Sequence, residues 1–264
     1  MNTGPEQPLA EKGVLVTGGL GALGTVVVER LTAEGARVIV NDLAPEPPVK
    51  FSGQGYVQGS AGTSADAARI IDETARLLGG PPHVVCCHAG IVRSAPLLEY
   101  DVADFQAVLQ TNLTAQFALA QAAARLWVHH DVPGHLIFTG SWVQDVPWPG
   151  VAAYSAAKAG LKSLMRSFAR ELAPYGIRAN GIAPGIVGAG MALKQWNTEP
   201  DYRARASRAI PLGALQSPDS VADAMGFLAS DRAQYMTGST LLADGGASLY
   251  PMDQSTPTPA ATDD

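Results

Sequence analysis

Residues 12–42 read KGVLVTGGLGALGTVVVERLTAEGARVIVND, and this stretch decides the fold. An apolar run at 13–16 stops at glycine, which predicts a buried strand followed by a turn. The turn TGGLGALG at 17–24 leads into a helical pattern, and a second apolar run then ends in Asp42. Strand, glycine-rich turn, helix, strand and acid, in this order, form the unit that a dinucleotide needs.

The glycine-rich turn predicts where the cofactor would bind. Glycines let a pyrophosphate approach the backbone, and the N-terminus of the following helix favours its negative charge. We expect the cofactor to contact these residues of the turn: Gly18, Leu20, Gly21, Ala22 and Leu23.

Asp42 bears on the choice of cofactor. Its carboxylate can accept hydrogen bonds from the adenosine ribose and would repel a 2′-phosphate. No arginine lies in the turn or just after Asp42 to bind such a phosphate. The sequence therefore favours NAD over NADP, the alternative being that Asp42 is only a solvated acid at a strand end.

Apolar runs and amphipathic helical patterns alternate along the rest of the chain. Further strands are expected near 55–58, 81–90, 133–141, 176–185 and 238–246. This alternation predicts an α/β fold: a single-domain, Rossmann-like, doubly wound parallel sheet of about seven strands with helices on both faces. We expect the domain to span 11–252, with a substrate lid at about 186–212 and flexible tails at 1–10 and 253–264.

The stretch SWVQDVPWPGVAAYSAAK at 141–158 carries a candidate catalytic set. Tyr154 and Lys158 stand four residues apart, so in a helix both side chains project from one face. A cation beside a phenol favours the phenolate, whose unperturbed pKa is about 10. Ser141 could bind the oxygen of an alcohol or carbonyl group, as hydride-transfer chemistry requires.

Composition narrows the class of protein further. The net charge of −6 and the absence of a Lys/Arg cluster argue against nucleic acid as a partner. No apolar run reaches membrane-spanning length and no signal peptide pattern is seen, so a cytoplasmic enzyme without a membrane partner is expected. The adjacent Cys86 and Cys87 are expected to be buried free thiols, and no metal-binding pattern is present.

Several motifs together give the chain a family resemblance. They are TGGLGALG at 17–24, HAG at 88–90, TNLT around Asn112, Ser141, YSAAK at 154–158, NGIAPG at 180–185, and YMTG at 235–238 with ADGG at 243–246. Over nearly its whole length the chain resembles the short-chain dehydrogenase/reductase family. The resemblance implies a seven-stranded Rossmann sheet and a homotetramer.

The resemblance also implies roles for four residues. Tyr154 would be the general acid/base, and Lys158 would lower its pKa and hold the nicotinamide ribose. Ser141 would orient the reacting oxygen, and Asn112 would hold a water in a proton relay through Lys158.

Further cofactor contacts follow from the resemblance at Ser60, Ala61, His88, Ala89, Gly90, Tyr154, Lys158, Pro184, Gly185 and Val187. Contacts to a small-molecule alcohol or sugar substrate are expected from Ser141, Val143, Gln144, Trp148 and Tyr154. Three departures from the family pattern stand out: Ala22 replaces a glycine, Cys87-His88 replaces two asparagines, and Ala189 replaces a threonine.

Within the family, the chain looks most similar to bacterial sugar 1-dehydrogenases of the glucose type. The similar segments are DVPWP at 145–149, NLTAQF at 112–117, WVHHDVPG at 127–134 and ADGGASLYP at 243–251. They predict NAD-dependent oxidation of an aldose at C1 to the lactone. The alternatives are a secondary-alcohol dehydrogenase, a ketone or 3-oxoacyl reductase of the same family, or a non-catalytic nucleotide-binding protein.

Overall fold

The computed structural model describes residues 7–249, so the tail expected at 253–264 lies outside the described residues. A single sheet of seven parallel strands has the order β3-β2-β1-β4-β5-β6-β7. The strands are β1 Gly13–Thr17, β2 Arg37–Asp42, β3 Gly55–Gln58, β4 Val84–Cys87, β5 Gly134–Thr139, β6 Ile177–Pro184 and β7 Thr240–Ala243. Successive strands are added outward on opposite sides of β1, which makes the β1/β4 boundary the switch point where ligands bind in such sheets. The predicted fold class is confirmed.

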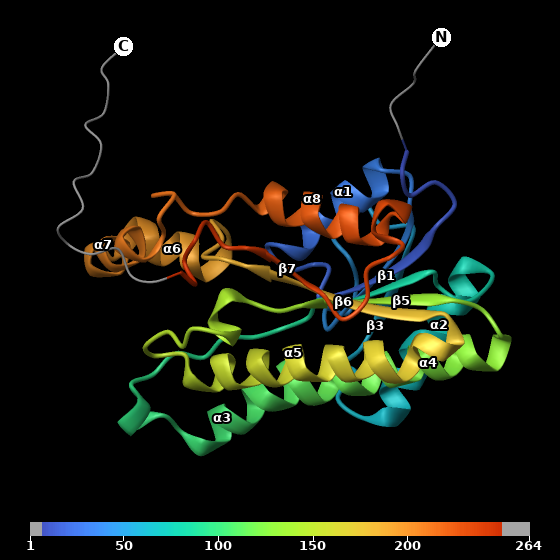
Figure 1. Ribbon diagram of the computed structural model, residues 1–264, viewed down its shortest axis with the longest axis horizontal. Helices are drawn as coiled ribbons and strands as arrows, with labels where there is room; N and C mark the ends of the chain where they lie inside the picture. Colours follow the sequence, from blue (N-terminus) through green and yellow to red (C-terminus); the bar gives the residue numbers. More distant parts are fainter. Residues whose placement is uncertain (1–6, 250–264) are drawn as a thin grey trace, which may run out of the picture.

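Helices cover both faces of the sheet (Figure 1). One face carries α1 Gly24–Ala33 and α8 Pro218–Ala229, and the other carries α2 Ser64–Leu78, α3 Val102–Leu109, α4 Ala115–His130 and α5 Ala152–Leu172. Short 3₁₀ turns lie at Leu97–Glu99, Trp142–Gln144, Ala173–Tyr175 and Asp231–Ala233. Short connections between strands and covering helices are what a doubly wound sheet requires.

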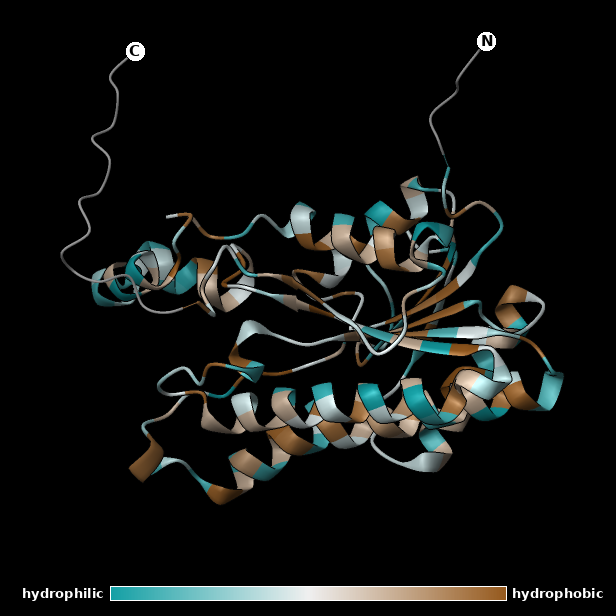
Figure 2. Ribbon diagram, in the orientation of Figure 1, coloured by the Kyte–Doolittle hydropathy of each residue, from teal (hydrophilic) through white to brown (hydrophobic). Residues whose placement is uncertain are grey.

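The core divides according to the two-residue period of the strands. In β1, Leu15 packs into the layer formed with α2, α4 and α5, whereas Val14 and Val16 pack into the layer formed with α1 and α8. All five residues of β1 are buried, because both faces of a parallel sheet are covered. Figure 2 shows hydrophobic residues running along these central strands.

The helical stretch after β4 is interrupted by a turn of different geometry. A π-helical turn at Gln110–Thr114 separates α3 from α4 and contains the buried Asn112. An extra residue per turn shifts the helix face, and such π-bulges often lie at functional sites. The periodicity of the sequence did not show this break, because apolar and small residues continue on both sides of it.

The segment at 186–212, expected as an irregular lid, contains two short helices. They are α6 Gly190–Thr198 and α7 Pro200–Ala209, and they lie together at one end of the molecule (Figure 1).

At the N-terminus, the flexible tail predicted for 1–10 is too long. Leu9 is fully buried and its amide donates to the Glu34 carbonyl. Within residues 7–249, the helices are too short or too polar to cross a bilayer.

Candidate active site

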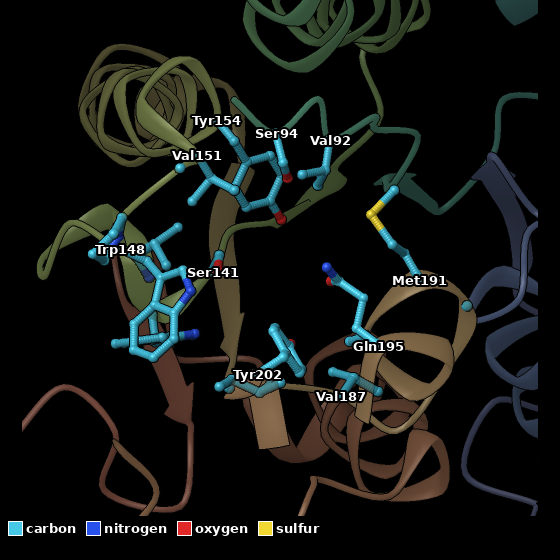
Figure 3. Close-up of a pocket in the computed structure, with 18 of the residues that line it drawn as sticks. Val92, Ser94, Ser141, Trp148, Val151, Tyr154, Val187, Met191, Gln195 and Tyr202 are labelled. Atoms are coloured by element: carbon cyan, nitrogen blue, oxygen red, sulfur yellow. Dashed lines mark hydrogen bonds between the residues drawn. The ribbon is translucent and has the colours of Figure 1, made fainter. Parts of the chain in front are cut away.

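A cavity of about 800 Å³ opens beyond the carboxyl ends of β4, β5 and β6. Figure 3 shows Tyr154 and Ser141 with their oxygens directed toward its open centre. Residues of the glycine-rich turn line one side, including Ala22 and Leu23, and residues of α6 and α7 line another. The cavity therefore joins the predicted nucleotide-binding turn to the predicted catalytic stretch.

The glycine-rich turn is held by close backbone packing. Gly18 has φ +67°, and a Cβ on it would lie 2.8 Å from the Ala89 Cα. A Cβ on Gly24 would overlap the Gly18 carbonyl oxygen. Ala22 has no such constraint, since its φ is not among the positive values of the described chain. Its methyl group is therefore compatible with the fold of the turn.

The N-terminus of α1 is prepared for an anion. It has no capping side chain and no acidic residue in its first turn. By contrast, α2 is capped by Thr63 and α8 by Ser217, and each has an acid in its first turn. The first amides of a helix need acceptors, and a phosphate supplies them. This arrangement fits the pyrophosphate of a dinucleotide.

Asp42 connects the end of β2 to the same turn. Its carboxylate accepts hydrogen bonds from the Leu20 amide at 3.0 Å and from the Leu43 amide at 2.7 Å. Among residues 7–249, Asp42 forms no ion pair with a lysine or arginine. No cation of the described chain therefore offsets the negative charge of Asp42, which would repel a phosphate bound beside the turn. Ser60 and Ala61 follow β3, beside β2 in the sheet.

The end of β4 is fixed by Thr17. The Thr17 hydroxyl accepts from the His88 and Ala89 amides at 3.0 and 3.1 Å and lies 3.2 Å from the Cys86 carbonyl as a donor. The His88 ring lies 2.9 Å from the Thr139 hydroxyl through Nδ1. Burial, aided by the nearby Lys158 ammonium, lowers the pKa of His88 to about 4. The imidazole is therefore neutral near pH 7, and its contact with Thr139 connects the ends of β4 and β5.

The structure brings the four predicted catalytic residues around one point. Tyr154 and Lys158 lie on α5, with the Lys158 Nζ 5.4 Å from the centre of the Tyr154 ring. Ser141 follows β5 and lies beside the phenol. A Cβ on Gly90 would lie 3.2 Å from the Asn112 Oδ1 and 3.8 Å from the Lys158 Nζ. The π-turn therefore delivers Asn112 to the floor of the same site.

A family model described as enoyl-(acyl carrier protein) reductase matches residues 19–248. The chain belongs to the short-chain dehydrogenase/reductase family. This dehydrogenase is 33% identical over 251 residues to 3beta-hydroxysteroid dehydrogenase 1 of Eggerthella lenta, covering 92% of this chain and 96% of the relative. It is 30% identical to glucose 1-dehydrogenase of Gluconobacter oxydans, with 91% and 93% coverage. It is also 34% identical to mouse (3R)-3-hydroxyacyl-CoA dehydrogenase, with 88% and 94% coverage.

Solved structures agree with this assignment. A short-chain type dehydrogenase/reductase from Mycobacterium marinum superposes with a TM-score of 0.83 at 28% identity, covering 93% of this chain and 98% of that one. A putative gluconate dehydrogenase from Agrobacterium tumefaciens gives 0.83 at 26% identity, with 93% and 99% coverage. The dehydrogenase is accordingly an oxidoreductase that acts on CH–OH groups with a nicotinamide cofactor, NAD(P).

The two titratable groups of the catalytic set are strongly perturbed in the dehydrogenase. Burial raises the pKa of Tyr154 to about 12, although the Ser141 hydroxyl beside it acts in the opposite direction. Burial lowers the pKa of Lys158 to about 8. The lowering of the Tyr154 pKa that the resemblance implied is therefore not produced by these side chains alone. The cost of burying the phenolate outweighs the effect of the neighbouring groups.

The side chain of Asn112 has a structural role in addition to the one expected. Its amide oxygen accepts from the Ile91 amide at 2.8 Å, and its amide nitrogen donates to the Ile91 carbonyl at 2.8 Å. Both ends of the side chain thus hold the loop after β4. Each end makes one of the two hydrogen bonds available to it, so the expected relay water at Asn112 stays a prediction.

Most of the predicted substrate contacts lie in the cavity, but Gln144 does not. Val143 and Trp148 line the cavity together with Ser141 and Tyr154. The Gln144 amide instead lies 3.3 Å from the Asp145 carboxylate, on the side where Lys162 pairs with that acid. Ser141 is followed by a 3₁₀ turn, in which successive side chains diverge by about 120°. Val143 therefore faces inward and Gln144 faces away.

Sequence reasoning missed two further parts of the cavity wall. These residues come from the loop after β4 and from α6 and α7: Val92, Ser94, Pro96, Met191, Gln195, Tyr202 and Arg205. Figure 3 shows Gln195 extending into the cavity across from Ser141 and Trp148. Residues 186–212, which contain α6 and α7, have weak periodicity and no motif, so only the folded structure could show that these side chains lie together. Among residues 7–249, no group of three or more metal-binding side chains is present.

Proposed function

We propose that the protein is an NAD-dependent dehydrogenase whose substrate is a large apolar molecule. The enzyme would oxidise a secondary alcohol on this molecule, or reduce the corresponding ketone. The observation that carries this proposal is the lining of the cavity. Around Tyr154 and Ser141 the wall is built mainly from apolar side chains: Val92, Pro96, Trp142, Val143, Trp148, Val151, Ile186, Met191 and Ala192. Such a wall favours binding of an apolar molecule, because contact removes apolar surface from water. It offers few hydrogen-bonding partners to a polar molecule.

The same lining disfavours the aldose that the sequence suggested. A sugar has a hydroxyl on nearly every carbon, and each buried hydroxyl without a partner costs on the order of 1–3 kcal/mol. Gln144, the expected partner, faces away from the cavity. The similarity at 145–149 and to the G. oxydans enzyme keeps aldose oxidation as the second candidate. The relatives named for hydroxysteroids and hydroxyacyl-CoA support the first.

The geometry supports a specific division of labour. In the oxidative direction the Ser141 hydroxyl would hydrogen-bond the substrate oxygen while the Tyr154 phenolate accepts its proton. Lys158 would favour that phenolate through its positive charge and bind the nicotinamide ribose. Bound NAD⁺ would supply the hydride acceptor and a second positive charge beside the phenol. Asn112 would position the turn at Gly90, against which the nicotinamide half would lie.

Asp42 supports the choice of NAD over NADP. Its carboxylate is fixed by the Leu20 and Leu43 amides, so it cannot swing away from a 2′-phosphate without losing both hydrogen bonds. Asp42→Asn keeps an acceptor for these amides and removes the charge. We expect the NAD/NADP ratio of kcat/KM to fall by at least about tenfold, because a charge repulsion near 1.4 kcal/mol is lost. An unchanged ratio would remove Asp42 from cofactor selection.

The remaining cofactor residues complete the proposal. The adenine would lie near Ser60 and Ala61, and the nicotinamide between Gly90 and the β6 end at Pro184, Gly185 and Val187. Residues 186–212 would close over the substrate. We also propose that the protein forms a homotetramer and is located in the cytoplasm. A groove of about 530 Å³ between α4 and α5, lined by the exposed Phe117 and Val128, supports assembly through these helices.

A substrate panel tests the proposed function. Hydroxysteroids, 3-hydroxyacyl thioesters, medium-chain secondary alcohols and aldoses would each be incubated with NAD and with NADP, and formation of reduced nicotinamide followed by absorbance. We expect the largest kcat/KM with an apolar secondary alcohol and NAD. Turnover confined to aldoses would overturn the proposal in favour of the second candidate. Tyr154→Phe serves as the control for chemistry at this site.

A further inference from the structure

The cavity wall contains one charged group whose purpose the proposed function leaves open. Among the described residues that line the cavity, Arg205 alone carries a charge. It lies on α7, the second of the two short helices in the 186–212 segment. A single cation in a mainly apolar wall is a candidate for substrate recognition.

The Arg205 guanidinium is held by two aromatic rings that also line the cavity. Its Cζ lies 5.2 Å from the centre of the Trp148 ring and 5.9 Å from that of Tyr202. Cation–π contacts at these distances favour a guanidinium over a ring face. They restrict the position of a long side chain that would otherwise move freely in solvent. Arg205 is therefore partly ordered before any ligand binds.

No protein carboxylate neutralises this guanidinium within the described part of the chain. The ion pairs found between residues 7 and 249 involve Lys12, Arg30, Arg76, Arg93 and Lys162. Contact with a ring face leaves the N–H groups at the edge of the guanidinium available as donors. Their planar arrangement matches the two oxygens of a carboxylate or phosphate.

We propose that Arg205 selects substrates with an oxyanion, a carboxylate or phosphate, at the end of the apolar body remote from the reacting carbinol carbon. The inference rests on the proposed function, because it places the reacting end at Tyr154 and Ser141. Trp148 and Tyr202 would contact the apolar body and orient the cation. Arg205 would then contribute to substrate binding and not to the hydride-transfer step.

A matched series of substrates tests this assignment. Straight-chain secondary alcohols with the hydroxyl next to one end and a carboxylate at the other, from six to twelve carbons, would be compared with their methyl esters. A terminal phosphate arm distinguishes the two oxyanions. We expect the wild-type enzyme to prefer an acid over its ester at one favoured length. Arg205→Gln should lower the acid/ester ratio of kcat/KM at least tenfold, chiefly through KM.

The variants separate a specific contact from a general charge effect. Arg208→Gln removes an exposed arginine from the same helix that does not line the cavity, and it should leave the ratio unchanged. Arg205→Lys should retain part of the preference for the acid, because lysine keeps the positive charge but lacks the planar guanidinium that binds two oxygens. Equal use of acid and ester by the wild type, or an unchanged ratio in Arg205→Gln, would overturn the assignment alone. If neither acids nor esters are turned over by an enzyme that oxidises another apolar secondary alcohol of the panel, the assignment of Arg205 is overturned. If no apolar secondary alcohol is turned over, the proposed function is overturned, and the assignment with it.

Discussion

The nucleotide-binding half and the α6–α7 segment contribute to the walls of one cavity by different means. In the first, every residue of β1 is buried and the turn after it is defined by backbone contacts of Gly18 and Gly24. In the second, α6 has no buried residue and α7 has only Ala206. Backbone geometry binds a part common to every turnover, the cofactor. Under the proposed function, side chains on the weakly packed helices would bind the part that varies, the substrate.

This difference implies a difference in mobility. Elements with few buried apolar contacts open at low free energy, and substrate-covering segments come from that class. The segment is anchored by a small cluster in which Ile186, Ala206 and Ile210 pack against Trp142 and Val143. Because this cluster includes residues that follow Ser141, closing of the segment and shaping of the substrate cavity are physically connected.

The largest effect is expected between the two walls, at Tyr154. Tyr154→Phe removes the proposed acid/base while keeping the ring, so kcat should fall about 10³-fold. NAD affinity, measured by quenching of protein fluorescence, should change little, since the turn and Asp42 are untouched. Retained turnover would show that the chemistry does not depend on the phenol and would break the proposed mechanism.

A glycine pair tests whether the nucleotide side is set by backbone packing. Gly18→Ala combines a positive φ with a Cβ that would lie 2.8 Å from the Ala89 Cα. Gly79→Ala is the matched control, because its φ is +75° and nothing lies within 4 Å of the added Cβ. We expect Gly79→Ala to lower the free energy of unfolding, measured by urea denaturation, by about 1–2 kcal/mol, because it adds only the strain of a left-handed backbone. Gly18→Ala should cost more and also weaken NAD binding. Equal losses in both variants would contradict the packing argument.

Lys158 offers a test through pH. Its pKa is lowered from 10.5 to about 8, so its contribution to stability is present above pH 10.5 and is lost as pH falls through 8. Near pH 7 the buried ammonium therefore destabilises the fold, and Lys158→Met should unfold at a higher temperature than the wild type. The gain should shrink as the pH rises from about 8 to above 10.5, where the wild-type lysine is neutral in both the folded and the unfolded state. A gain independent of pH would show that packing, not charge, explains it.

The smallest effect is expected on the substrate wall at Gln195. Its amide extends into the cavity from α6 (Figure 3). Gln195→Leu replaces one polar contact, so KM for the substrate should change about three- to tenfold, with NAD affinity unaffected. Gln144→Leu is the contrasting variant, since its side chain faces away from the cavity and should leave KM unchanged. A larger change at Gln144 would reverse the assignment of these two side chains.

Much of this protein can be predicted from short sequence patterns, for physical reasons. The short apolar runs at 13–16 and 38–40, bounded by turn residues, predict buried strands. The glycines between them permit a turn that other residues would not fit. Tyr154 and Lys158 face the same way because they are four residues apart on one helix. These features are local, so a reader of the sequence can infer them without knowing the rest of the chain.

Tertiary structure decided what depends on distant contacts. The π-turn at Asn112, the outward rotation of Gln144, and the placement of Arg205 over Trp148 have no local signature in the sequence. Each results from how separate elements pack, and the pKa values of Tyr154 and Lys158 depend on burial by that packing. The sequence by itself therefore determined the fold and the chemistry, whereas the shape, polarity and charge of the substrate cavity exist only once the chain is folded.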